Sequence, residues 1–212
     1  MRYYTSDIHF GYKQIISTAN RPFENTDEMN ETILRNINEV LNKDDVLIIL
    51  GDVCSYGNHQ VAIKYLKKVN CDKVLIIGNH DKEPLKHKSF RNMFVDIRDN
   101  EIIRDGKHSI FLSHYPHAEW DGYYKGIWHF YGHVHNSNQG AGKLMKLFPT
   151  SANVGMDVNN FRPHTANEII EKRMSEYKKG ICVTDDFIKT CIIPTIDNRA
   201  GYDDNLMKLA GY

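Results

Sequence analysis

Two short aliphatic runs, Val46–Leu50 and Val74–Ile77, constrain the fold of this chain more than any other feature. Each has the length of a strand and contains no polar residue, so both are expected to be strands buried on two faces. Apolar residues at helical spacing over 27–41 and about 58–69 predict a helix before each run. With a further strand predicted at Met1–Thr5, the order strand–helix–strand–helix–strand predicts an α/β fold with a right-handed parallel unit in the first half.

The second half of the chain contains strand signals in closer succession. The dipeptide Asp105-Gly106 is a turn signal, and it predicts a β-hairpin between 101–104 and 108–112. Two further strands are predicted near 128–131 and 152–154. The second half is therefore expected to add β-structure to the parallel unit.

A capping box marks the start of the last clear helix. Thr165 is followed three residues later by Glu168, which predicts a helix that Gly180 ends. A chain of 212 residues has room for one core. We therefore expect a single domain over residues 1–180 and a C-terminal extension, 181–212, to which the sequence assigns no role.

Composition and charge exclude several classes of protein. Hydrophobic residues make up 41% of the chain and charged residues 25%, which excludes a disordered or fibrous chain. Lys+Arg and Asp+Glu are both 27, and this neutral average argues against a general nucleic-acid binder or a polybasic membrane binder. No apolar run approaches the ~20 residues of a membrane helix, and the N-terminus has no apolar signal region. We therefore expect no association with a membrane.

The cysteines and histidines indicate the compartment and the kind of chemistry. The 4 cysteines are scattered, with no C-x-x-C pair, so the sequence predicts reduced thiols in a cytoplasmic protein. The 11 histidines are more than a protein surface usually carries, and imidazole is both the commonest metal ligand and a near-neutral acid or base. Metal or proton chemistry is therefore expected.

Polar motifs follow several of the predicted strands. Each combines a carboxylate, an imidazole or an amide with a Gly or Ser that allows a tight turn. In chain order they are Ser6-Asp7-Ile8-His9, Gly51-Asp52, Gly78-Asn79-His80-Asp81, Ser113-His114 and Gly132-His133-Val134-His135. Taken singly, each motif is more often a solvated turn. Because ligand-binding groups gather at the carboxyl ends of strands in α/β sheets, the complete series predicts one binding site.

In this order the motifs resemble the hallmark series of the calcineurin-like metallophosphoesterase superfamily: D-x-H, G-D, G-N-H-D/E, a single H and G-H-x-H. The resemblance covers about residues 1–170 and extends to the small bacterial and phage phosphoesterases, which open with D-x-H-F-G followed by R-P-F, here Arg21-Pro22-Phe23. It implies a four-layer α/β/β/α sandwich, in which two mixed β-sheets are flanked by helices.

The same resemblance implies two adjacent divalent metal ions. Their ligands would be Asp7, His9 and His135 for one ion, Asn79, His114 and His133 for the other, and Asp52 as a bridge between them. Carboxylate, amide and imidazole donors suit Mn²⁺, with Fe²⁺, Zn²⁺ and Ni²⁺ as alternatives. The absence of thiolates disfavours a purely structural zinc site.

Four more residues are expected to act at this site. His80 would face the leaving oxygen as a general acid or steady the charge of the phosphoryl group. Asp81 would accept a hydrogen bond from the other ring nitrogen of His80 and fix its tautomer. Tyr12 stands where the small phosphoesterases usually have His, and it would contact phosphate or stack on a base. The Arg21 guanidinium is shaped for a phosphate oxygen, although it also fits a role in closing the loop.

Other residues outside the motifs have structural and functional interpretations. His59, His87 and His108 stand in polar stretches and are expected to be surface residues. For His129, which is close in sequence to a motif, packing and a substrate contact both stay open. The aromatic cluster around Trp120 is expected to be a packed flap rather than a base-stacking platform.

The implied reaction is hydrolysis of a phosphate ester by in-line attack of a metal-bound hydroxide, without a phosphoenzyme. We predict a phosphodiesterase acting on a small nucleotide-like substrate, such as a cyclic nucleotide or a short oligonucleotide, because the motifs offer few cations for the dianion of a monoester. The alternatives are a phosphomonoesterase, a DNA-repair type of nuclease, and a non-catalytic scaffold on the same fold. The complete ligand set disfavours the scaffold. The sequence leaves the oligomeric state open.

Overall fold

The structure is a computed structural model that describes residues 1–178. The predicted stop at Gly180 and the extension 181–212 lie outside the described residues. The first half alternates strands and helices: β1 (Arg2–Thr5), α1 (Gln14–Thr18), α2 (Thr26–Val40), β2 (Val46–Leu50), α3 (His59–Leu66) and β3 (Asp72–Ile76). The next elements, with η marking a short 3₁₀ helix, are η1 (Pro84–Lys86), α4 (Lys88–Arg91), β4 (Asp96–Arg98), β5 (Asn100–Asp105) and β6 (His108–Ser113). The last are η2 (Tyr123–Lys125), β7 (Trp128–Tyr131), α5 (Gly140–Leu144), η3 (Met145–Leu147), β8 (Ser151–Asn153), η4 (Met156–Val158), β9 (His164–Thr165) and α6 (Ala166–Lys178).

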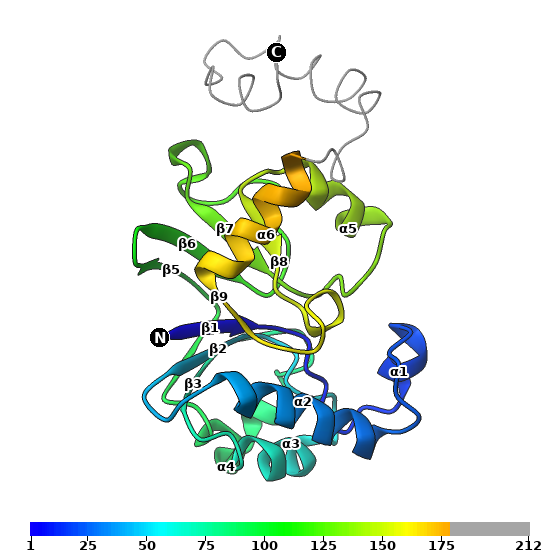
Figure 1. Cartoon of the computed structure of the whole chain (residues 1–212). Helices are drawn as coiled ribbons and strands as arrows, with labels where there is room; N and C mark the ends of the chain where they lie inside the picture. The colour runs from blue at the N-terminus through cyan, green and yellow to red at the C-terminus, as the bar shows by residue number, and fades with distance from the viewer. Residues whose placement is uncertain (179–212) are drawn as a thin grey trace.

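The strands form two mixed sheets. The first has the order β4-β3-β2-β1-β9, in which β1 to β4 run parallel and β9 runs antiparallel to β1. The second has the order β5-β6-β7-β8, in which only β5 runs antiparallel to its neighbour. Figure 1 shows α2, α3 and α4 on the outer side of the first sheet and α5 and α6 on the side of the second. The expected α/β architecture of two mixed sheets flanked by helices is confirmed.

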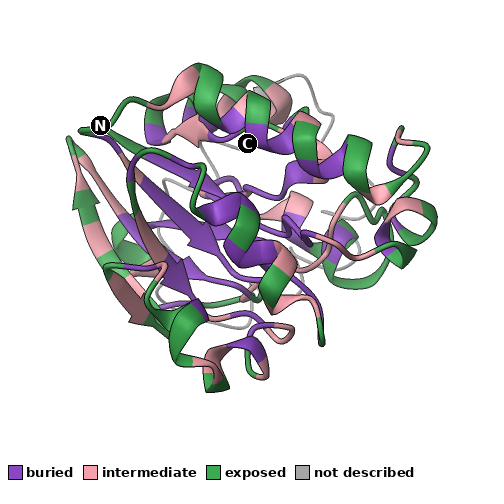
Figure 2. Ribbon diagram, turned by 90° about the horizontal axis from the view of Figure 1, so that it is seen from below, coloured by how far each residue is buried: buried purple, intermediate pink, exposed green. Residues whose placement is uncertain are grey.

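Alternation along the central strands builds two cores. In β2, Leu47 and Ile49 pack against the helices α2 and α3, whereas Ile48 and Leu50 join the residues between the two sheets. Successive side chains of a strand point to opposite faces, so a strand covered on both faces is apolar throughout. Figure 2 shows the resulting pattern, with the central strands buried and with helices that expose only their outer faces. Burial on both faces explains why this run contains no polar residue.

The second core lies between the sheets and beneath α6. Tyr4 of the first sheet meets Phe130 of the second edge to face, with ring centroids 5.2 Å apart. Ile169 and Ile170 of α6 pack into the same cluster. The capping box that predicts this helix is present, since the Thr165 N–H donates to a Glu168 carboxylate oxygen at 2.8 Å. Among the helices of residues 1–178, none has the length and apolar character that crossing a membrane requires.

The aromatic cluster near Trp120 covers part of the second sheet as a packed flap. Trp120 is buried, and its indole N–H donates to the Ile127 carbonyl at 2.8 Å. His129 lies buried under this flap, where its Nε2 accepts from the His117 N–H at 3.1 Å. Burial lowers the pKa of His129 to about 3. His129 is therefore a neutral packing residue.

Candidate metal centre

The polar motifs come together where strands of both sheets end. Asp7 follows β1, Asp52 follows β2 and Asn79 follows β3, all in the first sheet. His114 follows β6 and His133 follows β7 in the second sheet. Because these strands end at one edge of the sandwich, side chains that are far apart in sequence become neighbours.

The first group of side chains contains Asp7, His9 and His135. One potential ligand atom from each lies within 4.8 Å of the others. His135 Nε2 is 3.9 Å from Asp7 Oδ1, and the rings of His9 and His135 are stacked with centroids 5.3 Å apart. This is the group that the resemblance assigns to one metal ion.

The second group contains Asp52, His114 and His133, again with ligand atoms within 4.8 Å of one another. The amide oxygen of Asn79 lies between the two imidazoles, 2.9 Å from His114 Nε2 and 3.0 Å from His133 Nδ1. One amide oxygen, one carboxylate and two imidazoles therefore face a common point. These are the donors that the resemblance assigns to the other ion.

Asp52 lies between the two groups. Its Oδ2 is 3.7 Å from His9 Nε2 and 3.5 Å from His114 Nε2. Burial and the nearby Asp7 carboxylate raise the pKa of Asp52 to about 7. Positive ions on either side would favour the ionised carboxylate again. The position and the electrostatics of Asp52 both suit a bridging ligand.

His9 provides the sharpest test of whether metal ions fit this site. Its side chain is 1% exposed, and neither ring nitrogen has a hydrogen-bond partner among the residues that the structure describes. A buried polar atom without a partner is costly, and native proteins rarely contain one. Burial and the surrounding imidazoles hold the pKa of His9 well below its usual value, so the ring is neutral, which is the form that binds a metal. The residues present therefore fit divalent metal ions.

At the edge of the sandwich where the two groups lie, several residues have the left-handed backbone conformation, which is often found at functional sites. Of the non-glycine residues with positive φ among residues 1–178, most belong to the two groups: Asp7 (57°), His9 (57°), Asp52 (56°), His133 (69°) and His135 (49°). The left-handed region costs an L-residue about 1–2 kcal/mol, so surrounding packing must hold each of these residues in place.

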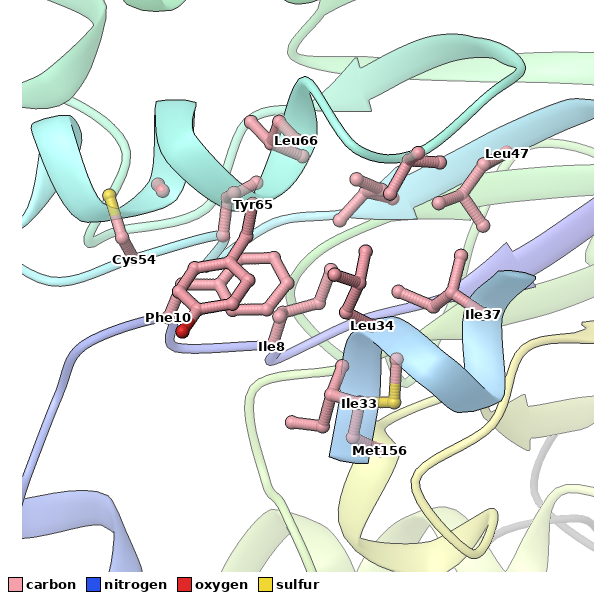
Figure 3. Close-up of a cluster of buried hydrophobic side chains, with 14 of the residues drawn as sticks. Ile8, Phe10, Ile33, Leu34, Ile37, Leu47, Cys54, Tyr65, Leu66 and Met156 are labelled. Atoms are coloured by element: carbon pink, nitrogen blue, oxygen red, sulfur yellow. The ribbon is translucent and has the colours of Figure 1, made fainter. Parts of the chain in front are cut away.

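The apolar residues that alternate with the polar ones supply this packing. Ile8 and Phe10 are fully buried in the core beneath α2 and α3. Phe10 stacks on Tyr65 with ring centroids 5.1 Å apart, as Figure 3 shows. Because Ile8 and Phe10 are fixed in the core, Asp7 and His9 are fixed at the edge.

Glycine is required before the polar residues because the strands approach closely there. A Cβ atom on Gly132 would lie 1.9 Å from Ser6 Oγ and 2.5 Å from Asp7 Oδ2. A Cβ atom on Gly51 would lie 2.4 Å from His114 Nδ1. The glycines of these motifs therefore let the two sheets bring their polar side chains together.

Comparisons with known proteins agree with this architecture. A family model described as calcineurin-like phosphoesterase matches residues 3–137, which is more than half of the chain. The chain belongs to the calcineurin-like phosphoesterase family. Proteins of this family are hydrolases of phosphate esters and normally depend on two metal ions.

Relatives of this phosphoesterase occur in archaea, bacteria and phages. An uncharacterized protein of Methanocaldococcus jannaschii is 30% identical over 170 residues, 80% of this chain and 89% of its own length. Gene 66 protein of Mycobacterium phage L5 is 28% identical over 63% of this chain and 77% of its own length. A crystal structure of a protein of unknown function from Aquifex aeolicus is 26% identical, with a TM-score of 0.64, and the match covers 81% of this chain and 98% of that one.

Two of the histidines in the phosphoesterase site have orienting partners. His114 donates from Nδ1 to the Leu50 carbonyl at 2.8 Å, which directs Nε2 toward Asn79. His135 Nδ1 lies 2.8 Å from the Asp157 carboxylate. Burial opposes protonation of His135, but the hydrogen bond to Asp157 and the charge of Asp7 raise its pKa above the usual value. Such partners fix the ring that a metal would bind.

Arg21 does not have the phosphate-facing position that the sequence suggests. It is 4% exposed, and its guanidinium donates to Asp157 at 2.8 Å, to the Asp7 carbonyl at 2.6 Å and to the Ile8 carbonyl at 3.0 Å. These bonds hold the strained Asp7 backbone and the partner of His135. The expected substrate contact is replaced by a buried positioning role.

Asp81 also differs from its expected role. Its carboxylate accepts hydrogen bonds from the backbone N–H groups of Asp52 at 2.8 Å, Val53 at 3.0 Å and Gly78 at 2.8 Å. Burial and the Asp52 carboxylate nevertheless raise its pKa to about 6. The polar atom that lies near the His80 ring is Ser55 Oγ, 3.4 Å from His80 Nδ1. Asp81 therefore fixes the loops beside the site rather than the tautomer of His80.

Three aromatic side chains border the site. The His80 ring lies 5.2 Å from His9, and Tyr12 lies 5.7 Å from His9 and 6.0 Å from His80. Tyr115 packs on His133 at 4.6 Å and is 43% exposed. Tyr115 was not predicted as a site residue, and its only signal in the sequence is its place after a motif histidine. These rings lie beside the candidate metal centre.

The Asp157 carboxylate allows a test of the positioning network. We expect Asp157→Asn to weaken Mn²⁺ binding by about 10–100-fold, because the His135 ring and Arg21 lose the charge that orients them. Competition with a metal-binding dye would measure the affinity. The exposed Asp99→Asn variant serves as the control for loss of one negative charge. Equal affinities in both variants would show that Asp157 does not support the site.

Proposed function

We propose that this phosphoesterase is a dinuclear metal-dependent phosphodiesterase acting on small nucleotide-like substrates. The proposed ligands are Asp7, His9, Asp52, Asn79, His114, His133 and His135. The observation that supports this most strongly is the convergence of these side chains around Asp52, together with a buried His9 ring that has no other partner among residues 1–178. Two divalent ions bound there would activate a water molecule and neutralise charge on the phosphate.

The side chains around the ligands would orient the ester and manage its protons. His80 borders the site through its contact with His9, and it is proposed to donate a hydrogen bond or a proton to the leaving oxygen. The half-buried Tyr12 and the exposed Tyr115 offer ring faces at the same site, where a nucleobase would stack. These contacts favour a substrate with an aromatic group beside the phosphate.

The distribution of cations favours a diester over a monoester. A monoester carries a dianionic phosphate, which commonly requires Arg or Lys in addition to the metals. The Arg21 guanidinium is buried and engaged with Asp157 and two carbonyl oxygens. Lys13 and Lys82, the nearest lysines in sequence to the motifs, are exposed. A single negative charge therefore matches the site better.

We expect kcat/KM for bis(p-nitrophenyl) phosphate to exceed that for p-nitrophenyl phosphate by about tenfold or more at saturating Mn²⁺, a difference of about 1.4 kcal/mol. Both esters release the same phenolate, so the leaving group is held constant, and the two substrates differ in the charge of the phosphate and in the second nitrophenyl group. A panel of 2′,3′- and 3′,5′-cyclic nucleotides and dinucleotides would then identify the substrate class. Faster hydrolysis of the monoester would contradict the diester assignment. If the protein hydrolysed neither ester and also retained no metal after purification, a non-catalytic scaffold would be favoured instead.

The donor set and the cysteines support the proposed metal and location. Carboxylates, an amide and imidazoles without a thiolate suit Mn²⁺, with Fe²⁺, Zn²⁺ and Ni²⁺ as the alternatives. Cys54 and Cys71 are free and buried, as reduced thiols in the cytoplasm would be. We propose a cytoplasmic manganese enzyme on these grounds.

A further inference from the structure

A second cluster of potential metal ligands lies outside the dinuclear centre. It consists of His59 at the start of α3, Glu83 before η1 and His87 between η1 and α4. None of these residues belongs to the groups around Asp52. The sequence predicts surface positions for both histidines, but all three residues are half-buried.

The three side chains are held close together. His87 Nε2 lies 3.1 Å from Glu83 Oε1, and the rings of His59 and His87 are stacked with centroids 3.8 Å apart and planes at 10°. One ligand atom from each residue lies within 4.8 Å of the others. Two imidazoles and one carboxylate are therefore gathered in one place.

Two atoms of the cluster lack partners. His59 Nδ1 and Glu83 Oε2 are buried, and neither has a hydrogen-bond partner of normal geometry within residues 1–178. A carboxylate oxygen only accepts, and a neutral imidazole nitrogen without a proton does the same. His87 Nε2 carries the proton of its 3.1 Å hydrogen bond to Glu83. Once a cation displaces that proton and Nδ1 holds the remaining one, a carboxylate and two imidazoles offer three electron-pair donors to one point.

We propose that His59, Glu83 and His87 form a binding site for one further divalent cation of the zinc type. A set of two imidazoles, one carboxylate and a water is typical of four-coordinate Zn²⁺. Zn–N and Zn–O distances of about 2.0–2.2 Å place tetrahedral donors about 3.3 Å apart, so binding would draw the three ligand atoms together and unstack the rings. The ion would satisfy both unpartnered atoms.

This site would connect two segments that border the dinuclear centre. His59 follows the loop that carries Ser55, and Glu83 follows His80 by three residues. Ser55 Oγ and His80 Nδ1 are already 3.4 Å apart. A cation held by His59, Glu83 and His87 would tie the loop to the segment that carries His80. The ion would lie outside the dinuclear centre and would affect it through the position of the segment that carries His80.

Zinc stoichiometry tests the proposal. The full chain and its variants would be equilibrated with Zn²⁺, passed through a desalting column and analysed for bound metal. We expect His59→Phe and Glu83→Gln each to retain one equivalent fewer than the unmodified protein. His59→Phe keeps a ring against His87, Glu83→Gln keeps the shape of the side chain, and His108→Gln controls for loss of an imidazole elsewhere. Equal zinc contents in all four proteins would overturn the proposal.

A site-resolved measurement keeps the test independent of variant folding. In the unmodified protein, ¹⁵N resonances of the histidine rings would be followed during addition of Zn²⁺. We expect the Nδ1 resonance of His59 and the Nε2 resonance of His87 to shift on binding, while those of His108 stay unchanged. Shifts restricted to the histidines around Asp52 would assign all bound zinc to the dinuclear centre and overturn the further site.

Discussion

The Asp52→Asn variant is expected to lose about 1000-fold or more of kcat/KM for bis(p-nitrophenyl) phosphate. Asp52 Oδ2 lies 3.7 Å from His9 Nε2 and 3.5 Å from His114 Nε2, so it is the carboxylate that joins the two proposed ligand groups. A bound metal contributes several kcal/mol to stabilising the transition state, and about 4 kcal/mol corresponds to a thousandfold change in rate. Removing the bridging charge should also lower the Mn²⁺ content of the protein.

The same variant has a second, independent readout in the metal-free protein. Burial and Asp7 raise the pKa of Asp52 from 3.8 to about 7. In the unfolded chain the Asp52 carboxyl group loses its proton near pH 3.8, whereas in the folded chain it loses it near about pH 7. As the pH rises between these two values, the free energy of unfolding therefore decreases. Asp52→Asn removes this cost. With a chelator present, we expect the stability gained by Asp52→Asn to be larger near about pH 7.5 than near about pH 4.5.

These two readouts separate a lost function from a lost fold. In the unmodified protein the His80 backbone N–H donates a hydrogen bond to Asp52 Oδ1 at 2.9 Å. The Asn side chain keeps an oxygen that can accept the same hydrogen bond. Chemical denaturation would measure stability, and the exposed Asp121→Asn variant would control for net charge. An Asp52→Asn protein with activity near that of the unmodified chain would contradict the bridging role.

The His80→Ala variant is expected to show the second largest loss of kcat/KM. The size of this loss should depend on the leaving group of the ester. General acid catalysis typically contributes about 10²–10⁴-fold to a rate. A proton donor matters most when the leaving oxygen is a basic alkoxide and least when it is a nitrophenolate. We therefore expect a loss of about 100-fold or more with a 2′,3′-cyclic nucleotide and a smaller loss with bis(p-nitrophenyl) phosphate.

Two further variants test how His80 acts. Ser55→Ala removes the hydroxyl that lies 3.4 Å from His80 Nδ1, and it should reduce activity less than His80→Ala does. His108→Ala removes an imidazole far away in sequence and serves as the control. Equal losses by His80→Ala with both kinds of leaving group would assign His80 to charge stabilisation instead of proton donation.

The central strands could be predicted because burial on two faces leaves a clear signature in sequence. Val46–Leu50 and Trp128–Tyr131 coincide with β2 and β7 as predicted. The edge strands gave no such signal. In β4 only Ile97 is apolar, and β9 has two residues, His164 and Thr165, which pair with β1. These strands form because a neighbouring strand offers hydrogen bonds, which no local pattern records.

The parts of the candidate site that could be predicted are the ones whose polar residues stand together in short sequence motifs. Asp7 and His9 lie two positions apart just after β1. Because the strands that carry the other motifs end at the same edge of the sandwich, Asp7 and His9 come to lie beside those motifs. The roles of Arg21 and Asp81 depend on what packs around them: Arg21 is enclosed with Asp157, and Asp81 meets three backbone amides. Asp157 itself stands outside the motifs, in η4. Side chains that act through distant partners cannot be assigned from spacing alone.

The location of bound Mn²⁺ tests the central claim most directly. Crystals of the full chain grown with Mn²⁺ and without chelator would be used to collect anomalous scattering data at the manganese absorption edge. We predict two anomalous peaks, one on each side of Asp52. The first should lie beside Asp7, His9 and His135, and the second beside Asn79, His114 and His133. Anomalous maps without peaks at these positions would contradict the dinuclear centre.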